Sequence, residues 1–247
     1  MNKRSYKILE LLNDEEKLSV NDISENLGVS LVTIRKDLTE LEERGLIKRA
    51  HGFAQRVSPV EITSRMSIDY ETKLLIAKRA VELVAPGETI MIESGSTCAM
   101  FALELVTQKD VTIVTNSSFI ARYIRHVPGA KVVLLGGNYQ NDSEVTVGPI
   151  TEMNAREYYV DKLFVGADGY VDDIGFTTMD HMRASAVRAM GENARQAYIL
   201  TTSIKFGDRG VARLFNTKQV HCVVTDSNLD PYYKKSLTNQ GIELILV

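Results

Sequence analysis

The chain has 247 residues, of which 44% are hydrophobic and 25% are charged, and its formal net charge at pH 7 is −3. This composition excludes a disordered or fibrous chain, and the length accommodates one α/β domain and a small additional domain. Because the sequence contains no apolar run of membrane-spanning length and no secretory segment, we expect a cytoplasmic protein with no membrane partner, and the acidic balance argues against nonspecific coating of nucleic acid.

Two amphipathic helices are predicted before residue 29. The first spans residues 4–13, where apolar side chains recur at helical spacing. The second opens at Ser19-Val-Asn-Asp22, which resembles a capping box, and Gly28 is placed to end it. A short helix that ends at a glycine just before another helix is typical of the helix-turn-helix motif, whose second helix lies in the major groove of DNA.

The next helix is the predicted DNA-recognition helix. It begins after Ser30, which can cap its first turn, and ends near Gly45. Apolar residues at spacings of four and three form its core-facing side: Ile34, Leu38 and Leu41. Asp37 either orients Arg35 or faces the core.

Residues 46–56 alternate loosely around Gly52 and predict a β-hairpin wing. Basic and hydroxyl side chains suited to phosphates and base edges stand on the free side of the helix and on the wing. The predicted DNA-contacting residues are Ser30, Thr33, Arg35, Lys36, Lys48, Arg49 and His51. Residues 30–56 hold six basic side chains against four acidic ones. Because one such helix makes few phosphate contacts, we expect double-stranded operator DNA to be bound by symmetric pairs, in a homodimer or homotetramer.

A fixed spacing links Arg4-x3-Ile8-x3-Leu12 with Ser30-x2-Thr33-Ile34-Arg35-Lys36-Asp37-Leu38 and continues through residues 41–52. This pattern resembles the signature of the DeoR family of sugar-metabolism repressors. The resemblance implies that residues 1–56 form a winged helix-turn-helix DNA-binding domain of a transcriptional regulator.

Residues 57–70 have no clear helical or strand period and are predicted to form a linker. From residue 71 to residue 247, short β-branched runs alternate with helical segments at 72–84, 97–106 and 185–194. The predicted strands are 89–93, 111–115, 131–135, 162–166, 198–201, 222–225 and 242–247. This alternation predicts an α/β domain for effector binding and oligomerisation, with a mostly parallel sheet covered on both faces.

In an open α/β sheet, ligands bind beyond the carboxyl ends of the strands. Glycines and small polar residues follow the predicted strands, where helix amino termini attract anions, and Asp168 offers a carboxylate to sugar hydroxyls. The predicted effector-binding residues are Ser94, Gly95, Ser96, Thr97, Asn116, Ser117, Gly136, Gly137, Asp168 and Lys205. Each of them alone also fits an ordinary helix cap or turn, but their joint position predicts a site for a phosphorylated small molecule.

A second set of motifs comprises Glu93-Ser-Gly-Ser-Thr97, Thr115-Asn-Ser117, Leu135-Gly-Gly137, residues 164–169 and Lys205-Phe-Gly207. These segments resemble the carboxyl-terminal effector domain of the DeoR family, which is similar in fold to ribose-phosphate isomerases and coenzyme A transferases. The resemblance implies a phosphorylated sugar as effector. At three positions this chain departs from the family pattern: Thr202 and Ala184 stand where the family usually has an acidic residue, and Ile204 stands where it usually has a hydroxyl. These departures leave the identity of the sugar open.

An isomerase-like enzyme would need a general base and a second polar group beside its substrate. Asp168 is the single strong candidate, and the four histidines show no nucleophile–base spacing, so we expect neither enzymatic activity nor catalytic residues. A further alternative keeps DNA binding but gives residues 71–247 only a role in oligomerisation. Cys98 and Cys222 lack metal-ligand spacing, so we predict no metal site and no cofactor and expect both thiols to be buried.

Overall fold

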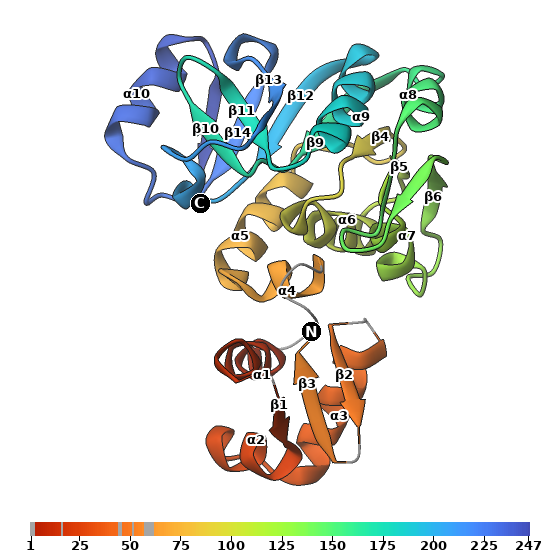
Figure 1. The fold of residues 1–247 in the computed structure, drawn as a ribbon, viewed down its shortest axis with the longest axis vertical. Helices are drawn as coiled ribbons and strands as arrows, with labels where there is room; N and C mark the ends of the chain where they lie inside the picture. Colours follow the sequence, from red (N-terminus) through yellow and green to blue (C-terminus); the bar gives the residue numbers. More distant parts are fainter. Residues whose placement is uncertain (1–2, 16, 44–45, 51, 57–61) are drawn as a thin grey trace. The chain divides into compact units, whose positions relative to one another are not determined.

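The computed structural model describes residues 3–15, 17–43, 46–50, 52–56 and 62–247. The chain divides into two compact units, Met1–Tyr70 and Glu71–Val247, both drawn in Figure 1. The division falls at the carboxyl end of the predicted linker, and each unit has its own buried core.

Local sequence signals set the helices of the amino-terminal unit. Helix α1 spans Lys3–Asp14, and α2 spans Val20–Leu27 between a capping box opened by Ser19 and Gly28, which ends the helix at φ 63°. Glycine suits this left-handed conformation because it lacks a Cβ atom. Helix α3 spans Leu31–Glu43. Its predicted core-facing residues are completely buried: Ile34, Leu38 and Leu41. The predicted helix-turn-helix is thereby confirmed.

Three short strands form an antiparallel sheet in the same unit. They are β1 (Lys17–Ser19), β2 (Ile47–Ala50) and β3 (Phe53–Arg56), in the order β1-β3-β2. Strands β2 and β3 form the predicted wing, with Lys48 opposite Gln55. Strand β1 is missing from the sequence-based prediction because three residues carry too little periodicity to be recognised. Gly45 and His51 lie outside the described residues.

The segment predicted as a linker is partly helical, which corrects that prediction. Helix α4 spans Ile62–Ser67 and contacts α1. Its Ile62 and Met66, four residues apart, are 2% and 0% exposed. A six-residue helix offers only these two apolar positions, so its period could not be separated from chance. Residues 57–61 lie outside the described residues.

A seven-stranded parallel sheet forms the centre of the carboxyl-terminal unit, with the strand order β15-β14-β12-β9-β4-β5-β6. The strands are β4 (Thr89–Ile92), β5 (Thr112–Thr115), β6 (Lys131–Leu134), β9 (Val160–Val165), β12 (Ala194–Leu200), β14 (Cys222–Thr225) and β15 (Glu243–Leu246). All seven were expected from the sequence, and the predicted α/β class is confirmed. The chain proceeds from β4 towards one edge and from β9 towards the other, so the direction reverses between these two neighbours. Open α/β sheets bind ligands at such a reversal.

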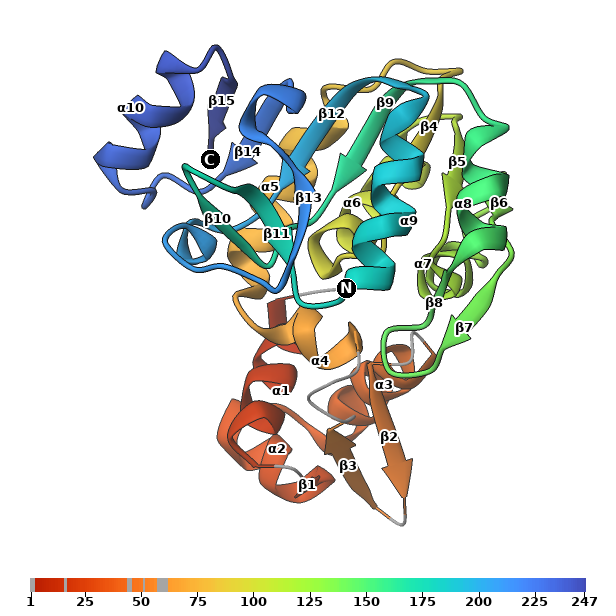
Figure 2. The ribbon, with the colours of Figure 1, turned by 45° about the horizontal axis from the view of Figure 1, so that its top comes forward.

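Helices cover both faces of this sheet (Figure 2). On one face α6 (Ser96–Gln108) contacts α7 (Ser118–Ile124), and on the other α8 (Pro149–Arg156) contacts α9 (His181–Glu192). The remaining helices are α5 (Tyr70–Val81) and α10 (Pro231–Asn239). Helix α9 begins four residues before its predicted start because the Asp180 carboxylate caps it by accepting from the backbone N of Arg183.

Two small antiparallel sheets were not predicted. One is the ribbon of β7 (Asn138–Gln140) and β8 (Val145–Val147), and the other contains β10 (Gly169–Val171), β11 (Gly175–Thr178) and β13 (Ala212–Phe215). Single turns of 3-10 helix, η1 (Ser203–Lys205) and η2 (Thr217–Gln219), flank β13. Both sheets lie beside predicted effector residues, because Asn116 bonds to β8 and Asp168 bonds to Thr178 of β11.

Aromatic and aliphatic side chains fill the interior of this unit. Phe164 of β9 packs against Phe101 and Tyr198, with ring centroids 4.4 and 4.9 Å apart. Cys98 and Cys222 are fully buried free thiols, as predicted, and burial raises the pKa of Cys222 to about 12. Within the described residues we find no helix long and apolar enough to span a bilayer and no group of side chains suited to a metal ion.

Candidate DNA-binding surface and effector site

The start of α3 holds the predicted DNA-contacting residues on one exposed side. The carbonyl oxygen of Ser30 accepts from the N–H of Ile34 at 3.0 Å, and its hydroxyl lies 2.9 Å from that of Thr33. Thr33 is therefore partly engaged with the helix cap. Arg35 and Lys36 are exposed, on the side of α3 away from its buried residues.

Asp37 faces the core and does not orient Arg35. It is 3% exposed and pairs with Arg4 of α1, whose Nη2 donates to Oδ1 at 3.1 Å. The hydrogen bond that Arg4 donates to Asp37 raises the pKa of the Arg4 guanidinium. Since a buried carboxylate requires such a partner, this contact fixes α3 against α1.

The wing is tied to the recognition helix by Arg49. Its Nη1 donates to Thr39 Oγ1 at 2.8 Å, and its backbone N donates to Glu42 Oε1 at 3.0 Å. The guanidinium also lies 3.8 Å from Glu42 Oε2. Arg49 thus uses its guanidinium Nη1 within the unit, and both Arg49 and Lys48 on the same strand are exposed.

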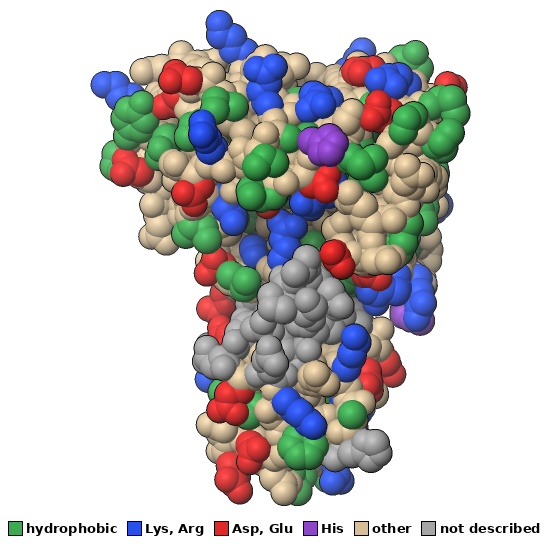
Figure 3. Space-filling view, viewed as in Figure 1, with side chains coloured by type: hydrophobic (Ala, Val, Ile, Leu, Met, Phe, Trp, Pro, Cys, Tyr) green, Lys and Arg blue, Asp and Glu red, His purple; other side chains and the backbone are tan. Residues whose placement is uncertain are grey.

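A hollow of about 770 Å³ lies between the start of α2, the outer side of α3 and the wing. It brings together two of the predicted residues, Arg35 and Arg49, and its other lining residues are Ser19, Val20, Asn21, Glu42, Ala50, Gly52 and Phe53. Phe53 is 39% exposed, and the ammonium of Lys17 lies 4.4 Å from its ring centroid. Figure 3 shows acidic and basic side chains interspersed on the visible face of this unit, without a broad basic field.

In the carboxyl-terminal unit, the predicted effector residues gather at the carboxyl edge of the parallel sheet. Glu93, directly after β4, is 7% exposed. Its carboxylate accepts from the Ser94 hydroxyl at 2.7 Å and from the backbone N of Gly95 and Gly166 at 2.8 and 3.2 Å. This side chain, which the prediction left out, therefore joins the loops that follow β4 and β9.

Helix α6 begins immediately after this junction. Gly95 is its N-cap residue and provides no side-chain hydrogen bond to the first turn. The hydroxyls of Ser96 and Thr97, 6% and 5% exposed, have no hydrogen-bond partner among the described residues. Backbone N–H groups and two hydroxyls therefore remain available at the positive end of a thirteen-residue helix.

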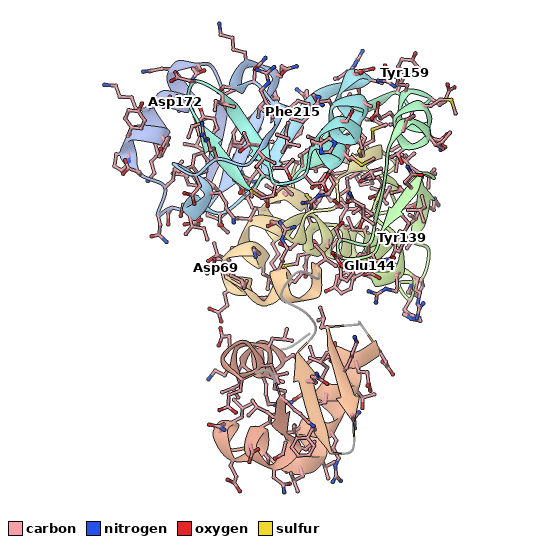
Figure 4. The ribbon with its side chains drawn as sticks, viewed as in Figure 1. Asp69, Tyr139, Glu144, Tyr159, Asp172 and Phe215 are labelled. Atoms are coloured by element: carbon pink, nitrogen blue, oxygen red, sulfur yellow. The ribbon has the colours of Figure 1, made fainter. Side chains whose placement is uncertain are left out.

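The residues after β5 are mostly engaged within the protein. Ser117 caps α7 by accepting from the N–H of Ile120 at 3.1 Å. Asn116 is fully buried, and its Nδ2 donates to the carbonyl oxygen of Thr146 in β8 at 3.0 Å, but its Oδ1 has no partner. The β7–β8 turn is held to α7 by Glu144, labelled in Figure 4, which accepts from Arg122 at 2.7 Å. The ribbon thus covers Asn116 from one side.

Gly137, one of the predicted effector residues, and Gly169, which was not in that set, serve the packing of the protein's own chain. At Gly137, a Cβ atom would lie 1.9 Å from Thr151 Oγ1 and 2.8 Å from the carbonyl oxygen of Val147. At Gly169, it would lie 2.4 Å from the carbonyl oxygen of Asp208. At Gly169 the loop after β9 therefore approaches the backbone of another loop of the chain closely.

The remaining predicted residues lie on loops after β9 and β12. Asp168 Oδ2 accepts from Thr178 Oγ1 at 2.8 Å and from the backbone N of Met179 at 3.1 Å. Lys205 lies at the end of η1, and its ammonium makes no hydrogen bond or ion pair with the described residues. The predicted set is thus brought to one edge of the sheet, but the groups left for a ligand are mainly Ser96, Thr97 and Lys205.

A buried acid that was not predicted fixes the Lys205 loop. Asp226 follows β14, is 6% exposed, and accepts from the N and Oγ of Ser203, each at 2.7 Å. Burial disfavours its charge, but the hydrogen bonds from Ser203 outweigh burial and lower the pKa of Asp226. Its ionised carboxylate therefore anchors η1 beside the sheet.

Two protein families match the chain. The DeoR-like helix-turn-helix domain matches residues 4–60, and the DeoR C terminal sensor domain matches residues 68–227. Together these matches cover most of the amino-terminal unit, without α4, and the parallel sheet through β14.

Relatives are similar over nearly their whole length. The HTH-type transcriptional regulator GlpR of Haloferax volcanii is 30% identical over 98% of this chain and 96% of its own. The transcriptional repressor AccR of Agrobacterium fabrum is 30% identical over 91% and 89%, and the HTH-type transcriptional repressor CsqR of Escherichia coli is 28% identical over 99% and 95%. Ribose 5-phosphate isomerase A of Methanocaldococcus jannaschii aligns with 56% of this chain and 55% of its own, at a TM-score of 0.42 and 23% identity.

The glycine contacts yield a paired stability prediction. Gly137→Ala places a methyl group against Thr151 and adopts an unfavourable φ of 149°, so we expect the free energy of unfolding to fall by about 2 kcal/mol or more. Gly136→Ala is the control, because its Cβ atom would meet only Asn154 Nδ2 at 3.5 Å. Urea unfolding followed by circular dichroism measures both, and equal stability of the two variants would contradict the packing role of Gly137.

The carboxylate of Asp226 yields a pH prediction. Because its pKa is lowered in the folded state, its stabilising effect is present above the unfolded value of about 3.9 and is lost as the pH falls through the folded value. Asp226→Asn should lower the free energy of unfolding at pH 7 by about 1–3 kcal/mol, and the difference should shrink below about pH 4. Asp208→Asn, at an exposed position, should change little at either pH. A pH-independent difference for Asp226→Asn would rule out the ionised carboxylate as its cause.

Proposed function

Because the chain belongs to the DeoR family of transcriptional regulators, we propose that it represses an operon for sugar transport or catabolism and that a phosphorylated sugar controls its binding to DNA. Family membership establishes a DNA-binding regulator, and the nature of the operon and the effector is our proposal. The observation that carries the proposal is the pairing of an exposed recognition helix in one unit with an anion-suited helix terminus at the sheet edge in the other.

In the proposed DNA complex, α3 lies in the major groove. Arg35 and Lys36 contact base edges or phosphates from its exposed side, and Lys48 contacts the flanking backbone. The hollow beside α3 accommodates a sugar-phosphate strand, since Arg35 and Arg49 stand on its walls. Arg49 exchanges Thr39 and Glu42 for a phosphate, which offers a stronger charge-assisted contact. Two copies bind symmetric half-sites, because one helix of this kind contacts few phosphates.

In the proposed effector complex, the phosphate is bound at the start of α6. The N–H groups of the first turn and the hydroxyls of Ser96 and Thr97 donate to its oxygens, and Lys205 contributes positive charge. Glu93 is occupied by its own loops and so repels the phosphate less than an unpaired carboxylate would. A sensing role is also favoured over isomerisation, because Asp168, the candidate base, is held by Thr178 and Met179.

Control of DNA binding follows from differential affinity. An effector that binds more tightly to the arrangement unable to contact both half-sites withdraws the protein from DNA. Tenfold weaker DNA binding requires a coupling free energy of about 1.4 kcal/mol. Such a coupling is well within the range of one or two charge-assisted hydrogen bonds at the effector site.

The role of Arg35 can be tested by operator titration. Arg35→Ala should cost about 1–3 kcal/mol of operator binding and relax the preference at one base pair. Lys36→Ala, if it removes a phosphate contact, should weaken binding to all sequences alike and reduce the salt dependence by about one unit of slope. Lys218→Ala removes the same charge from the carboxyl-terminal unit and is the control. Wild-type affinity and base preference of Arg35→Ala would remove this residue from the interface.

Effector binding can be tested by thermal shift on the full chain. Phosphorylated sugars should raise the melting temperature, with a stabilisation of about 2.7 kcal/mol at a concentration one hundred times Kd, and unphosphorylated sugars should not. Thr97→Val should weaken the response about tenfold or more, whereas Thr107→Val, at the exposed far end of α6, should not. If no phosphorylated sugar shifts the melting temperature or releases operator DNA, the unit serves oligomerisation instead.

A further inference from the structure

The first turn of α9 carries a guanidinium group, that of Arg183, that makes no hydrogen bond and no close ion pair with the described residues. The Nε atom of Arg183 is buried and makes no hydrogen bond, and within the described residues the guanidinium acts on Asp180 through charge alone. Only its backbone N is engaged, by donating to Asp180 Oδ1 at 2.9 Å. A buried donor without an acceptor is costly, and Arg183 as a whole is only half-buried, so a ligand that brings an acceptor to its guanidinium would be favourable.

Arg183 lies at the same edge of the sheet as the predicted effector residues. Asp168, after β9, accepts from the backbone N of Met179, so α9 begins at the carboxyl end of that strand. On the other side, Gln140 of β7 donates to Asp180 at 3.0 Å. The start of α9 therefore lies between the loop after β9 and the β7–β8 ribbon, which covers Asn116. Asn116 Oδ1 is a second buried atom without a partner there.

At this edge the carboxylates have hydrogen-bond partners within the described part of the protein, whereas the basic groups do not. Each of four carboxylates already accepts two or more hydrogen bonds from the protein: Glu93, Asp168, Asp180 and Asp226. The ammonium of Lys205 and the guanidinium of Arg183 donate no hydrogen bond to the described residues. A ligand at this edge therefore meets cations whose donors make no hydrogen bond and carboxylates whose oxygens already accept hydrogen bonds, which favours an anion at more than one point.

Building on the proposed effector site, we propose that Arg183 binds a carboxylate of the effector and that the effector is a phosphorylated sugar acid. The phosphate lies at the start of α6, and the acid group pairs with the planar guanidinium, whose donors match a carboxylate. A carboxylate fits better here than a second phosphate because Asp180 is close. Burial disfavours the charge of Asp180, but bonds from Arg183 N and Gln140 and the charge of Arg183 lower its pKa, so it stays negative and repels a dianion more strongly.

Matched ligand pairs test this assignment in the full chain by thermal shift and calorimetry. The pairs are ribose 5-phosphate with 5-phosphoribonate, glucose 6-phosphate with 6-phosphogluconate, and galactose 6-phosphate with 6-phosphogalactonate. We expect at least one acid to bind about tenfold or more tightly than its aldose partner, and Arg183→Gln to abolish that preference. Arg188→Gln is the control, because its guanidinium donates to the carbonyl oxygen of Arg213 on the exposed side of the same helix.

The outcomes separate this inference from the proposed function. If aldose phosphates bind as tightly as the acids, the carboxylate assignment is wrong and the sugar-phosphate sensor stands. If none of the six compounds binds, both are wrong. If the Arg183→Gln variant still binds the sugar-acid phosphate more tightly than its aldose partner, the carboxylate of the ligand is bound by a residue other than Arg183. A marked fall in the melting temperature of unliganded Arg183→Gln, with the acid preference unchanged, gives Arg183 a structural role and overturns the assignment.

Discussion

The carboxylate of Glu93 is the interaction on which the carboxyl-terminal unit depends. It lies where the strand order reverses, and it joins two loops that would otherwise present unpaired backbone N–H groups to each other. The approach is possible because neither Gly95 nor Gly166 has a side chain, and a Cβ atom on Gly95 would lie 3.3 Å from the Cα of Gly166. The orientation of α6, and hence of any anion site at its start, follows from this junction.

The acidic residues at the carboxyl edge of the sheet have a different role from the hydroxyl-bearing and basic residues there. Acids such as Asp168 and Asp226 position loops, and they do so through hydroxyl and backbone donors of the protein itself. The neutral hydroxyls of Ser96 and Thr97 and the basic side chains stay without partners in the described part of the chain. The acids at this edge are therefore engaged in holding loops, whereas the hydroxyls and the basic groups can still donate hydrogen bonds to a ligand. This arrangement suits the binding of an anion.

The features of the fold that depend on neighbouring residues, namely the helices with their caps and the central strands, could be predicted from the sequence. The spacing of Ile34, Leu38 and Leu41, the cap at Ser19 and the left-handed Gly28 follow from helix periodicity and backbone sterics, and the seven central strands follow from β-branched runs. Partners far apart along the chain were not predictable, because nothing local encodes them. Arg4 pairs with Asp37 across 33 positions, and Glu93 reaches Gly166 across 73.

The site residues were predicted by position rather than by role. Their place at strand ends followed from the α/β alternation, but Ser117, Gly137 and Asp168 turned out to hold neighbouring segments of the protein. The short strands of the two small sheets escaped prediction because three or four residues give no reliable period. Arg183 had no signal in the sequence either, since a buried unpaired nitrogen is visible only once the surrounding loops are placed.

The pairing of Arg4 with Asp37 anchors α3 on its inner side, while Arg35 and Lys36 project from its outer side. Substitutions of Arg35 and Lys36 therefore leave the anchor in place, because these side chains are exposed and make no hydrogen bond or ion pair with Arg4 or Asp37. A lineage can thus acquire new target sequences by exchanging a few surface residues, without having to rebuild the scaffold that presents them.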